Sequence, residues 1–264
     1  MKIVFLGAGN VAHHLARECE NAGHEILAVY SRKKIHADEL AELLSGAVPT
    51  DQLDFSESEG QLFFLTLSDD AIDEVVARLV LPEEALLVHT SGAKPLDDLR
   101  KLLTIYSDVP VKAGVLYPLQ SISRKIELVW KEVPLCIEAE DEEAESQLID
   151  LARQISEEVY LVNSEERLRL HMAAVFANNF PNHLWAIAKE LLEQQNLEFD
   201  LLKPIIKETL RKALEADHPA DVQTGPARRG DQGTMSRHLS LLEDEPHLAR
   251  IYQILSESIM RWYL

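Results

Sequence analysis

The sequence predicts an α/β protein: a doubly wound, mostly parallel Rossmann sheet followed by an all-helical domain. Three observations lead to this fold class. Short apolar runs alternate with helical patterns up to about residue 163, a glycine-rich turn follows the first of these runs, and strand-like runs stop after residue 163. Alternation of strands and helices is typical of parallel sheets with helices on both faces. We therefore expect a Rossmann domain over 1–163 and a helical domain over 164–264.

The first part of the chain contains seven apolar runs that predict strands. Most are almost continuously apolar, as expected for strands that are covered on both faces. The runs are KIVFLG, EILAVYSR, QLFFLTL, ALLVHT, VKAGVLYPL, PLCIEA and EVYLV. Helical patterns lie between several of them, at about 10–22, 35–45, 70–79, 95–103 and 142–157.

The second part reads as helices alone. A long helical stretch runs from Ser164, the expected N-cap, to about residue 195, and Pro181 predicts a kink or a break inside it. Further helices are expected at about 198–216, 234–243 and 246–262. The loop 217–233 is rich in proline and glycine, so no helix is expected there.

The composition disfavours binding to nucleic acid or membranes, a disulfide framework and a cysteine metal site. The 264 residues are 46% hydrophobic and 27% charged, and the formal net charge is −19. So acidic a protein is a poor partner for nucleic acid or for an anionic membrane surface. The cysteines, Cys19 and Cys136, form neither a disulfide framework nor a metal-type cluster, and no metal is expected. Because the chain begins with a strand pattern and has no long apolar run, we expect a cytoplasmic protein.

A glycine-rich turn follows the first strand. Residues 7–12 read G-x-G-x-x-A and open a helix, which is the context of a dinucleotide-binding motif. Gly7 permits the tight turn, Gly9 permits close approach of a pyrophosphate, and Ala12 permits close packing of the helix on the strand. Asn10 and Val11 then bring free backbone amides to the anion. The alternative is an ordinary strand–helix turn.

The end of the second strand predicts which dinucleotide binds. A carboxylate there would hold the ribose 2′-hydroxyl of NAD, but this chain has Ser31, Arg32 and Lys33. A hydroxyl and cations suit the 2′-phosphate of NADP, and a guanidinium can also stack on adenine. We therefore expect NADP as the cofactor. The alternative is a solvated basic turn.

The ends of three other strands, at 66–70, 89–93 and 116–120, are expected to complete the cleft, since ligands bind at the carboxyl ends of parallel strands. Ser68 and Thr90 are expected beside the cofactor, although Ser68 could equally serve as a helix N-cap. Ser91 and Gly92 offer a hydroxyl and open backbone amides near the nicotinamide and the substrate.

The helical part supplies a candidate proton donor. On a regular helix His171, Val175, Asn178 and Asn182 would share one stripe. Histidine is suited to proton transfer at neutral pH, and asparagine can orient a carbonyl or an amide. We therefore predict His171 as general acid or base, with Asn178 and Ser91 positioning the substrate. The alternative is a hydrogen-bonded core histidine with structural asparagines.

The glycine-rich segment TGPARRGD, residues 224–231, carries two adjacent arginines. Arginine presents a planar fork that matches carboxylate or phosphate. We predict that this loop folds over the cleft of its own or a neighbouring subunit and that Arg229 binds an anion of the substrate or cofactor. Arg228 is expected to be a surface charge, and Asp231 to cap the next helix or brace Arg229.

Several of these segments together resemble one family. GAGNVA, LSDDAI, VHTSGA, YPLQS, HMAAVFANN and TGPARRGD occur in the order found in NADP oxidoreductases that pair a Rossmann-like domain with a helical C-terminal domain of unknown function. The chain is also similar to pyrroline-carboxylate reductases, deazaflavin-dependent NADP reductases, β-hydroxyacid dehydrogenases and 6-phosphogluconate dehydrogenase. The resemblance implies a helical domain like the C-terminal domain of 6-phosphogluconate dehydrogenase, and a homodimer formed through it.

One departure limits what the resemblance implies. The β-hydroxyacid dehydrogenases have a catalytic lysine where this chain has Val175. We therefore expect an NADP-dependent oxidoreductase that moves hydride between NADPH and a small, anionic carbonyl, imine or hydroxy compound, without the lysine mechanism. The alternative is a non-catalytic NADP-binding regulator or scaffold protein.

Overall fold

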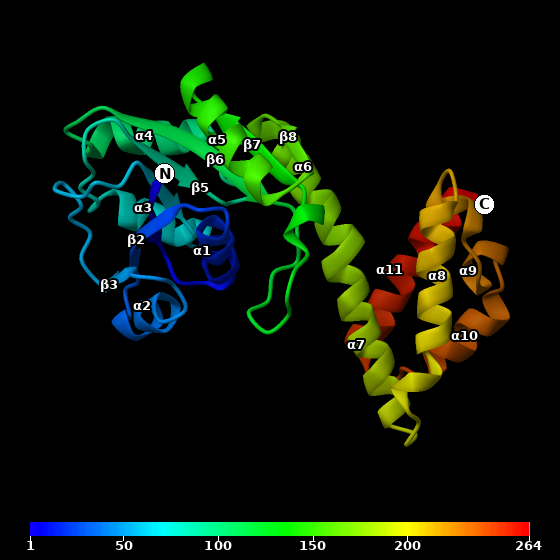
Figure 1. Ribbon diagram of the computed structural model, residues 1–264. Helices are drawn as coiled ribbons and strands as arrows, with labels where there is room; N and C mark the ends of the chain where they lie inside the picture. The colour runs from blue at the N-terminus through cyan, green and yellow to red at the C-terminus, as the bar shows by residue number, and fades with distance from the viewer. Residues whose placement is uncertain (264) are drawn as a thin grey trace. The chain divides into compact units, whose positions relative to one another are not determined.

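The computed structural model describes residues 1–263, which divide into two compact units (Figure 1). The first unit is Met1–His183 and the second begins at Leu184. The last strand ends at Leu161 and the next helix begins at Ser164, so the change from alternating to helical structure occurs there. The domain limit that we predict at residue 163 separates an NADP-binding part from a part for substrate binding and dimerisation. This division stays a prediction.

The first unit is built on one eight-stranded sheet in the order β3-β2-β1-β4-β5-β6-β7-β8. All neighbouring strands are parallel except β6 and β7, which confirms the mostly parallel Rossmann sheet. The strands are β1 (Lys2–Leu6), β2 (Glu25–Tyr30), β3 (Val48–Thr50), β4 (Leu62–Leu65), β5 (Ala85–His89), β6 (Val111–Pro118), β7 (Leu135–Ala139) and β8 (Val159–Leu161). The edge strand β3 was not expected, because it is three residues long and contains a proline.

Side chains of the central strands alternate between two apolar layers. On β1, Ile3 and Phe5 pack into one hydrophobic cluster, and Val4 and Leu6 pack into the other. The first cluster contains residues of α1, α2 and α5, and the second contains residues of α3 and α4. Both faces of the sheet are therefore covered, which explains the almost continuously apolar strand sequences.

The helices of the first unit follow the expected pattern. They are α1 (Asn10–Asn21), α2 (Lys34–Ala41), α3 (Asp69–Val76), α4 (Leu96–Tyr106), α5 (Glu142–Ile155), α6 (Ser164–Ala174) and the start of α7 (Phe180–Glu193), with a short 3₁₀ turn η1 (Trp130–Glu132). Ser164 is not the N-cap of α6. Asn163 has that role, and its side chain accepts from the amides of Glu165 and Glu166 in a capping box. Ser164 instead bonds to Glu138 on β7.

The second unit is helical. It contains the rest of α7, then η3 (Phe199–Leu201), α8 (Lys203–Glu215), η4 (Pro219–Val222), α9 (Pro226–Arg229), α10 (Gln232–Ser240) and α11 (Pro246–Tyr263). The expectation of no helix over 217–233 was wrong, since η4 and α9 are single turns that both begin with a proline. Proline at a first helical position supplies a suitable φ and loses no hydrogen bond.

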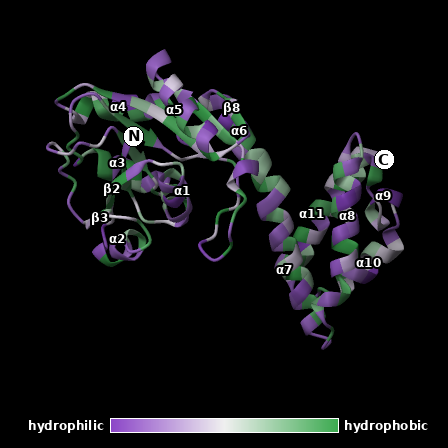
Figure 2. Cartoon of the chain, in the orientation of Figure 1, coloured by the Kyte–Doolittle hydropathy of each residue, from purple (hydrophilic) through white to green (hydrophobic). Residues whose placement is uncertain are grey.

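The helices of the second unit carry hydrophobic and hydrophilic residues along their whole length (Figure 2). Neither α7 nor α8 contains a fully buried residue. Within residues 1–263, every helix is too short or too polar to cross a lipid bilayer.

Candidate functional site

The glycine turn after β1 has the shape needed to hold a pyrophosphate. Gly7 has a φ of +122°, and a Cβ there would lie 2.4 Å from the carbonyl oxygen of Thr66, which directly follows β4. The turn is fixed because the Gly7 amide donates to the Tyr30 carbonyl at 2.9 Å and the Thr66 hydroxyl donates to the Gly7 carbonyl at 3.1 Å. Gly7 is therefore required at this position.

The first turn of α1 is open to an anion. Gly9 is the N-cap residue of this helix, no side chain caps it, and its first turn contains no acidic residue. The amides of the first turn of a helix lack partners within the helix and favour a negative charge. Ala12 is fully buried against the sheet, as the motif predicts.

The predicted 2′-phosphate residues follow β2 directly. Ser31 is half-buried, and its amide donates to the Thr50 carbonyl at 3.0 Å. Arg32 and Lys33 are exposed, and Nη1 of Arg32 lies 3.7 Å from a carboxylate oxygen of Glu74, which is also exposed. A surface ion pair of this kind contributes little to stability, so the guanidinium is free to turn to a phosphate.

A cavity of about 860 Å³ lies beside the glycine turn, at the carboxyl ends of the central strands. Seven of the candidate site residues line it, together with parts of the predicted strand ends 66–70 and 116–120: Gly9, Asn10, Val11, Ser68, Thr90, His171 and Asn178. The other lining residues are Thr66, Leu67, Tyr117, Pro118, Leu119, Gln120, Ser121, Ile122, Leu170, Ala173, Ala174, Ala177 and Asn179. The structure thus brings the glycine turn and the candidate proton donor to one cavity of the first unit.

His171 is held by Tyr117, which the sequence predicts only as part of a strand end at the cleft. The Tyr117 hydroxyl lies 3.0 Å from Nδ1 of His171, and the two rings meet edge to face with centroids 5.8 Å apart. Burial raises the pKa of Tyr117 to about 12, so its hydroxyl stays protonated at neutral pH. Nε2 is then the nitrogen of His171 that remains for a ligand.

The Ser91-Gly92 turn packs directly against this pair. A Cβ on Gly92 would lie 2.7 Å from Nδ1 of His171 and 2.9 Å from Cζ of Tyr117. The Ser91 hydroxyl oxygen accepts from the amides of Ala93 and Lys94, at 3.0 and 2.9 Å. Its oxygen is therefore engaged in the turn, while its hydrogen remains to be donated.

A π-helical segment, η2 (Val175–Asn179), separates α6 from α7. The Phe180 amide donates to the Val175 carbonyl, five residues earlier, and Pro181 follows one residue on. The expected break at this proline is thus a widened turn. The extra residue per turn changes the predicted stripe: Ala174 and Asn179 line the cavity, and Val175 and Asn182 do not.

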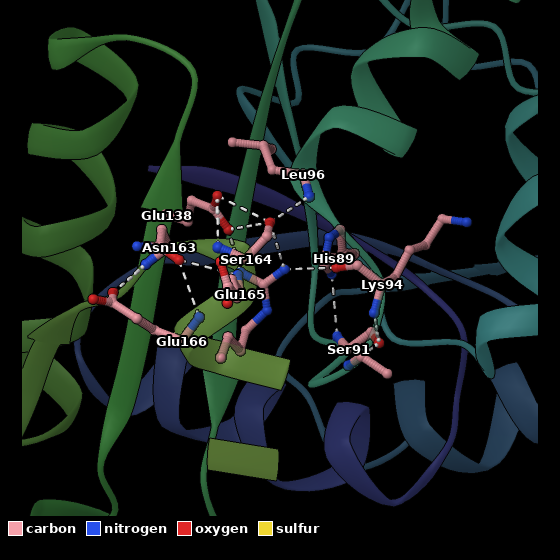
Figure 3. A network of polar contacts seen from close by, with 11 residues as sticks. His89, Ser91, Lys94, Leu96, Glu138, Asn163, Ser164, Glu165 and Glu166 are labelled. Atoms are coloured by element: carbon pink, nitrogen blue, oxygen red, sulfur yellow. Dashed lines mark hydrogen bonds and ion pairs between the residues drawn. The ribbon is translucent and has the colours of Figure 1, made fainter. Parts of the chain in front are cut away.

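A buried polar network lies behind the Ser91-Gly92 turn (Figure 3). Arg167, whose side chain is 1% exposed, forms an ion pair with Glu138 on β7 and donates to the Lys94 carbonyl at 2.6 Å. Arg167 lies one helical turn before His171, so it joins α6 to β7 and to the loop after β5. The sequence gives no signal for this role, because a charged residue at this position reads as surface.

His89 ends β5 inside the same network. It is fully buried, and its Nδ1 accepts from the Ser91 amide at 3.2 Å. Burial, with smaller contributions from Arg167 and Lys94, lowers the pKa of His89 to about 3. His89 is therefore neutral at physiological pH and acts as an acceptor for the turn.

The arginine segment belongs to the second unit. Arg228, predicted as a surface charge, is partly exposed, and its guanidinium lies over the ring of Tyr263, 4.3 Å from the ring centroid. Arg229 is exposed at the end of α9. Asp231 caps α10 by accepting from the Thr234 amide at 3.0 Å, which confirms its predicted capping role.

Comparisons with known proteins agree with this geometry. Residues 2–92 match the model of a family described as NADP oxidoreductase, coenzyme F420-dependent, and residues 133–259 match a domain of unknown function, DUF2520. A solved structure from Bacteroides fragilis, named "putative NADP oxidoreductase", is 40% identical, with 98% of each chain covered and a TM-score of 0.88. This chain belongs to the same family of NADP oxidoreductases.

More distant solved structures share the fold of this oxidoreductase. A Thermotoga maritima protein is 22% identical, with 98% of this chain and 97% of that chain covered and a TM-score of 0.66. An imine reductase of Myxococcus stipitatus, solved with NADP⁺, is 16% identical, with 99% and 92% covered and a TM-score of 0.63. No curated protein matches the chain.

Proposed function

We propose that this oxidoreductase reduces a small carbonyl or imine compound, or oxidises the corresponding hydroxy or amino compound, with His171 as the proton-transfer group. The observation that carries the proposal is the His171–Tyr117 pair, which lines the same cavity as the glycine turn. Hydride transfer to a C=O or C=N carbon needs a proton at the heteroatom, and an imidazole within one cavity can supply it.

The residues present fit NADP. The sterically closed Gly7 turn and the open first turn of α1 suit the pyrophosphate, and Ser31, Arg32 and Lys33 suit the 2′-phosphate. Ser68 and Thr90 line the same cavity and would contact the cofactor there. NADPH, when bound, supplies the hydride, and the protein supplies orientation and a proton path.

His171 transfers the proton through Nε2, because Nδ1 is bonded to Tyr117. Asn178 lines the cavity from the π-helical segment and would orient the substrate. The Ser91 hydroxyl, whose oxygen accepts from the Ala93 amide, still has its hydrogen to donate to the substrate. The Tyr117 bond holds the ring in one orientation, so the reactive nitrogen is fixed relative to the cofactor.

We further propose an anionic substrate that Arg229 binds, and a homodimer formed through the helical part. Support for Arg229 comes from its exposure and from the fork geometry of a guanidinium. Arg229→Ala should weaken an anionic ligand by roughly one to two orders of magnitude without lowering the melting temperature. Normal binding with lower stability would make Arg229 an internal brace.

Cofactor choice tests the proposal most simply. NADPH and NADH are titrated against the parent protein and Arg32→Ala. The parent should prefer NADPH, and the variant should lose roughly ten-fold or more in NADPH affinity, because a charge-assisted contact to phosphate is lost. Equal affinity of the parent for both dinucleotides would contradict the proposed cofactor site.

A non-catalytic NADP-binding regulator is the second candidate. Its support is Val175, which stands where the β-hydroxyacid dehydrogenases have a catalytic lysine. Tight NADPH binding without turnover of any oxo-acid or imine would favour it.

A further inference from the structure

The segment between β6 and β7 contacts α1 near its amino-terminal end, although the two are distant in sequence. Asn10 Nδ2 donates at 3.1 Å to the carbonyl of Ile122, which is 112 residues further along the chain. His14 Nε2 donates to the Ser123 carbonyl at 2.9 Å. These two bonds anchor the segment on the helix that the dinucleotide motif opens.

Arg124 continues this segment and reaches the glycine turn itself. Its Nη2 donates to the carbonyl of Ala8, the residue between Gly7 and Gly9. Its Nη1 lies 3.4 Å from a carboxylate oxygen of Glu39 on α2, and the arginine side chain is 35% exposed. The guanidinium is therefore held beside the pyrophosphate-binding turn and remains accessible.

The positive charge of Arg124 influences the first turn of α1, where it contributes to a lowered pKa of His13. Burial lowers the pKa of His13, and Arg124 is the next largest cause of this shift. The His13 amide donates to the Gly9 carbonyl at 3.0 Å, so this residue belongs to the turn that would receive the phosphates. A cation thus adds to the helix amides at the point where a dinucleotide carries two phosphate charges.

We propose that Arg124 binds the pyrophosphate of the cofactor, and that Glu39 holds the guanidinium until the cofactor arrives. The Glu39 contact is long and partly exposed, so a phosphate oxygen can replace it with a shorter, charge-assisted bond. The bond to the Ala8 carbonyl keeps the arginine over the turn throughout. This inference rests on the NADP site proposed above.

The test separates the pyrophosphate from the 2′-phosphate. Arg124→Gln keeps a donor for the Ala8 carbonyl and removes the charge, and Arg124→Ala removes both. Lys125→Ala is the matched control, since it deletes an exposed positive charge one residue away. NADP⁺ and NAD⁺, which share the pyrophosphate, are titrated against each protein, and circular dichroism checks the fold.

In each Arg124 variant the affinity for NADP⁺ and the affinity for NAD⁺ should fall by the same factor, roughly ten-fold or more. Lys125→Ala should bind both dinucleotides like the parent. Parent-like binding by Arg124→Gln would overturn the inference, as would a loss confined to NADP⁺ or an equal loss in Lys125→Ala. If the parent itself binds neither dinucleotide, the proposed function fails instead.

Discussion

The turn beside the His171–Tyr117 pair has no space for an added methyl group at Gly92. Gly92 has room for no Cβ, because the rings of His171 and Tyr117 occupy the space. Gly92→Ala should therefore displace His171 and lower turnover by roughly ten-fold or more, since small misplacements of a catalytic group are costly. The control is Gly233→Ala on α10, where the nearest atom to the new Cβ would be 3.7 Å away. Unchanged turnover in Gly92→Ala would contradict the role of this turn.

His89 should make stability depend on pH. Its pKa is about 3 in the folded protein and about 6.5 in the unfolded chain, so the unfolded chain binds more protons between these values. Stability is therefore fully present above about pH 6.5 and is lost as the pH falls towards 3, by up to about 1.4 kcal/mol per pH unit.

His89→Asn isolates this effect, because its amide oxygen can replace Nδ1 as acceptor for the Ser91 amide. Melting temperatures of parent and variant are compared at pH 7 and pH 5. The parent should lose more stability than the variant on acidification. Equal losses would show that another group controls the acid response.

At the scale of elements, the π-helical segment decides which asparagines face the cavity. A regular helix would have turned Asn182 towards His171, whereas the structure turns Asn179 there. Turnover and KM are compared for Asn179→Ala and Asn182→Ala. The first should raise KM or lower kcat several-fold, because a lining polar group is lost, and the second should behave like the parent. The reverse result would mean that the helix is regular when the enzyme works.

Elements differ in how well the sequence predicts them. The central strands and α1 were predicted because apolar runs and the Gly7–Ala12 motif are local signals. The antiparallel direction of β7 was not, because an apolar run carries no direction. The π segment was predicted only as a break at Pro181, since one widened turn leaves the apolar pattern almost unchanged. Contacts such as Arg124 with Ala8 depend on a segment far along the chain.

At the scale of the whole molecule, the helical part leaves several large apolar side chains exposed to solvent. Leu201, Ile205 and Leu214 are more than 60% exposed. We predict that a second copy covers this surface, as the resemblance implies for the family. Sedimentation at micromolar concentration should show a dimer, and Ile205→Asp should shift it towards monomer. A monomeric parent would contradict the prediction.

The sequence predicts individual residues of the candidate site better than it predicts the contacts between them. His171, Asn178, Gly9 and Ser68 were expected as lining residues and the structure brings them to one cavity. Tyr117 was expected at the cleft as part of the strand end 116–120, but its bond to His171 was not expected, because α6 lies far along the chain. Its role appears only when β6 and α6 are placed side by side.

The most direct test of the central claim is NADPH oxidation by the parent and by His171→Ala, with a panel of small oxo-acids and imines. His183→Ala, an exposed histidine on α7, is the control. We predict turnover of at least one compound by the parent and by the control. His171→Ala should be slower by roughly 10²–10⁴-fold with unchanged NADPH affinity, because only the proton transfer is lost. Equal rates for parent and His171→Ala, or NADPH binding without any turnover, would contradict the account.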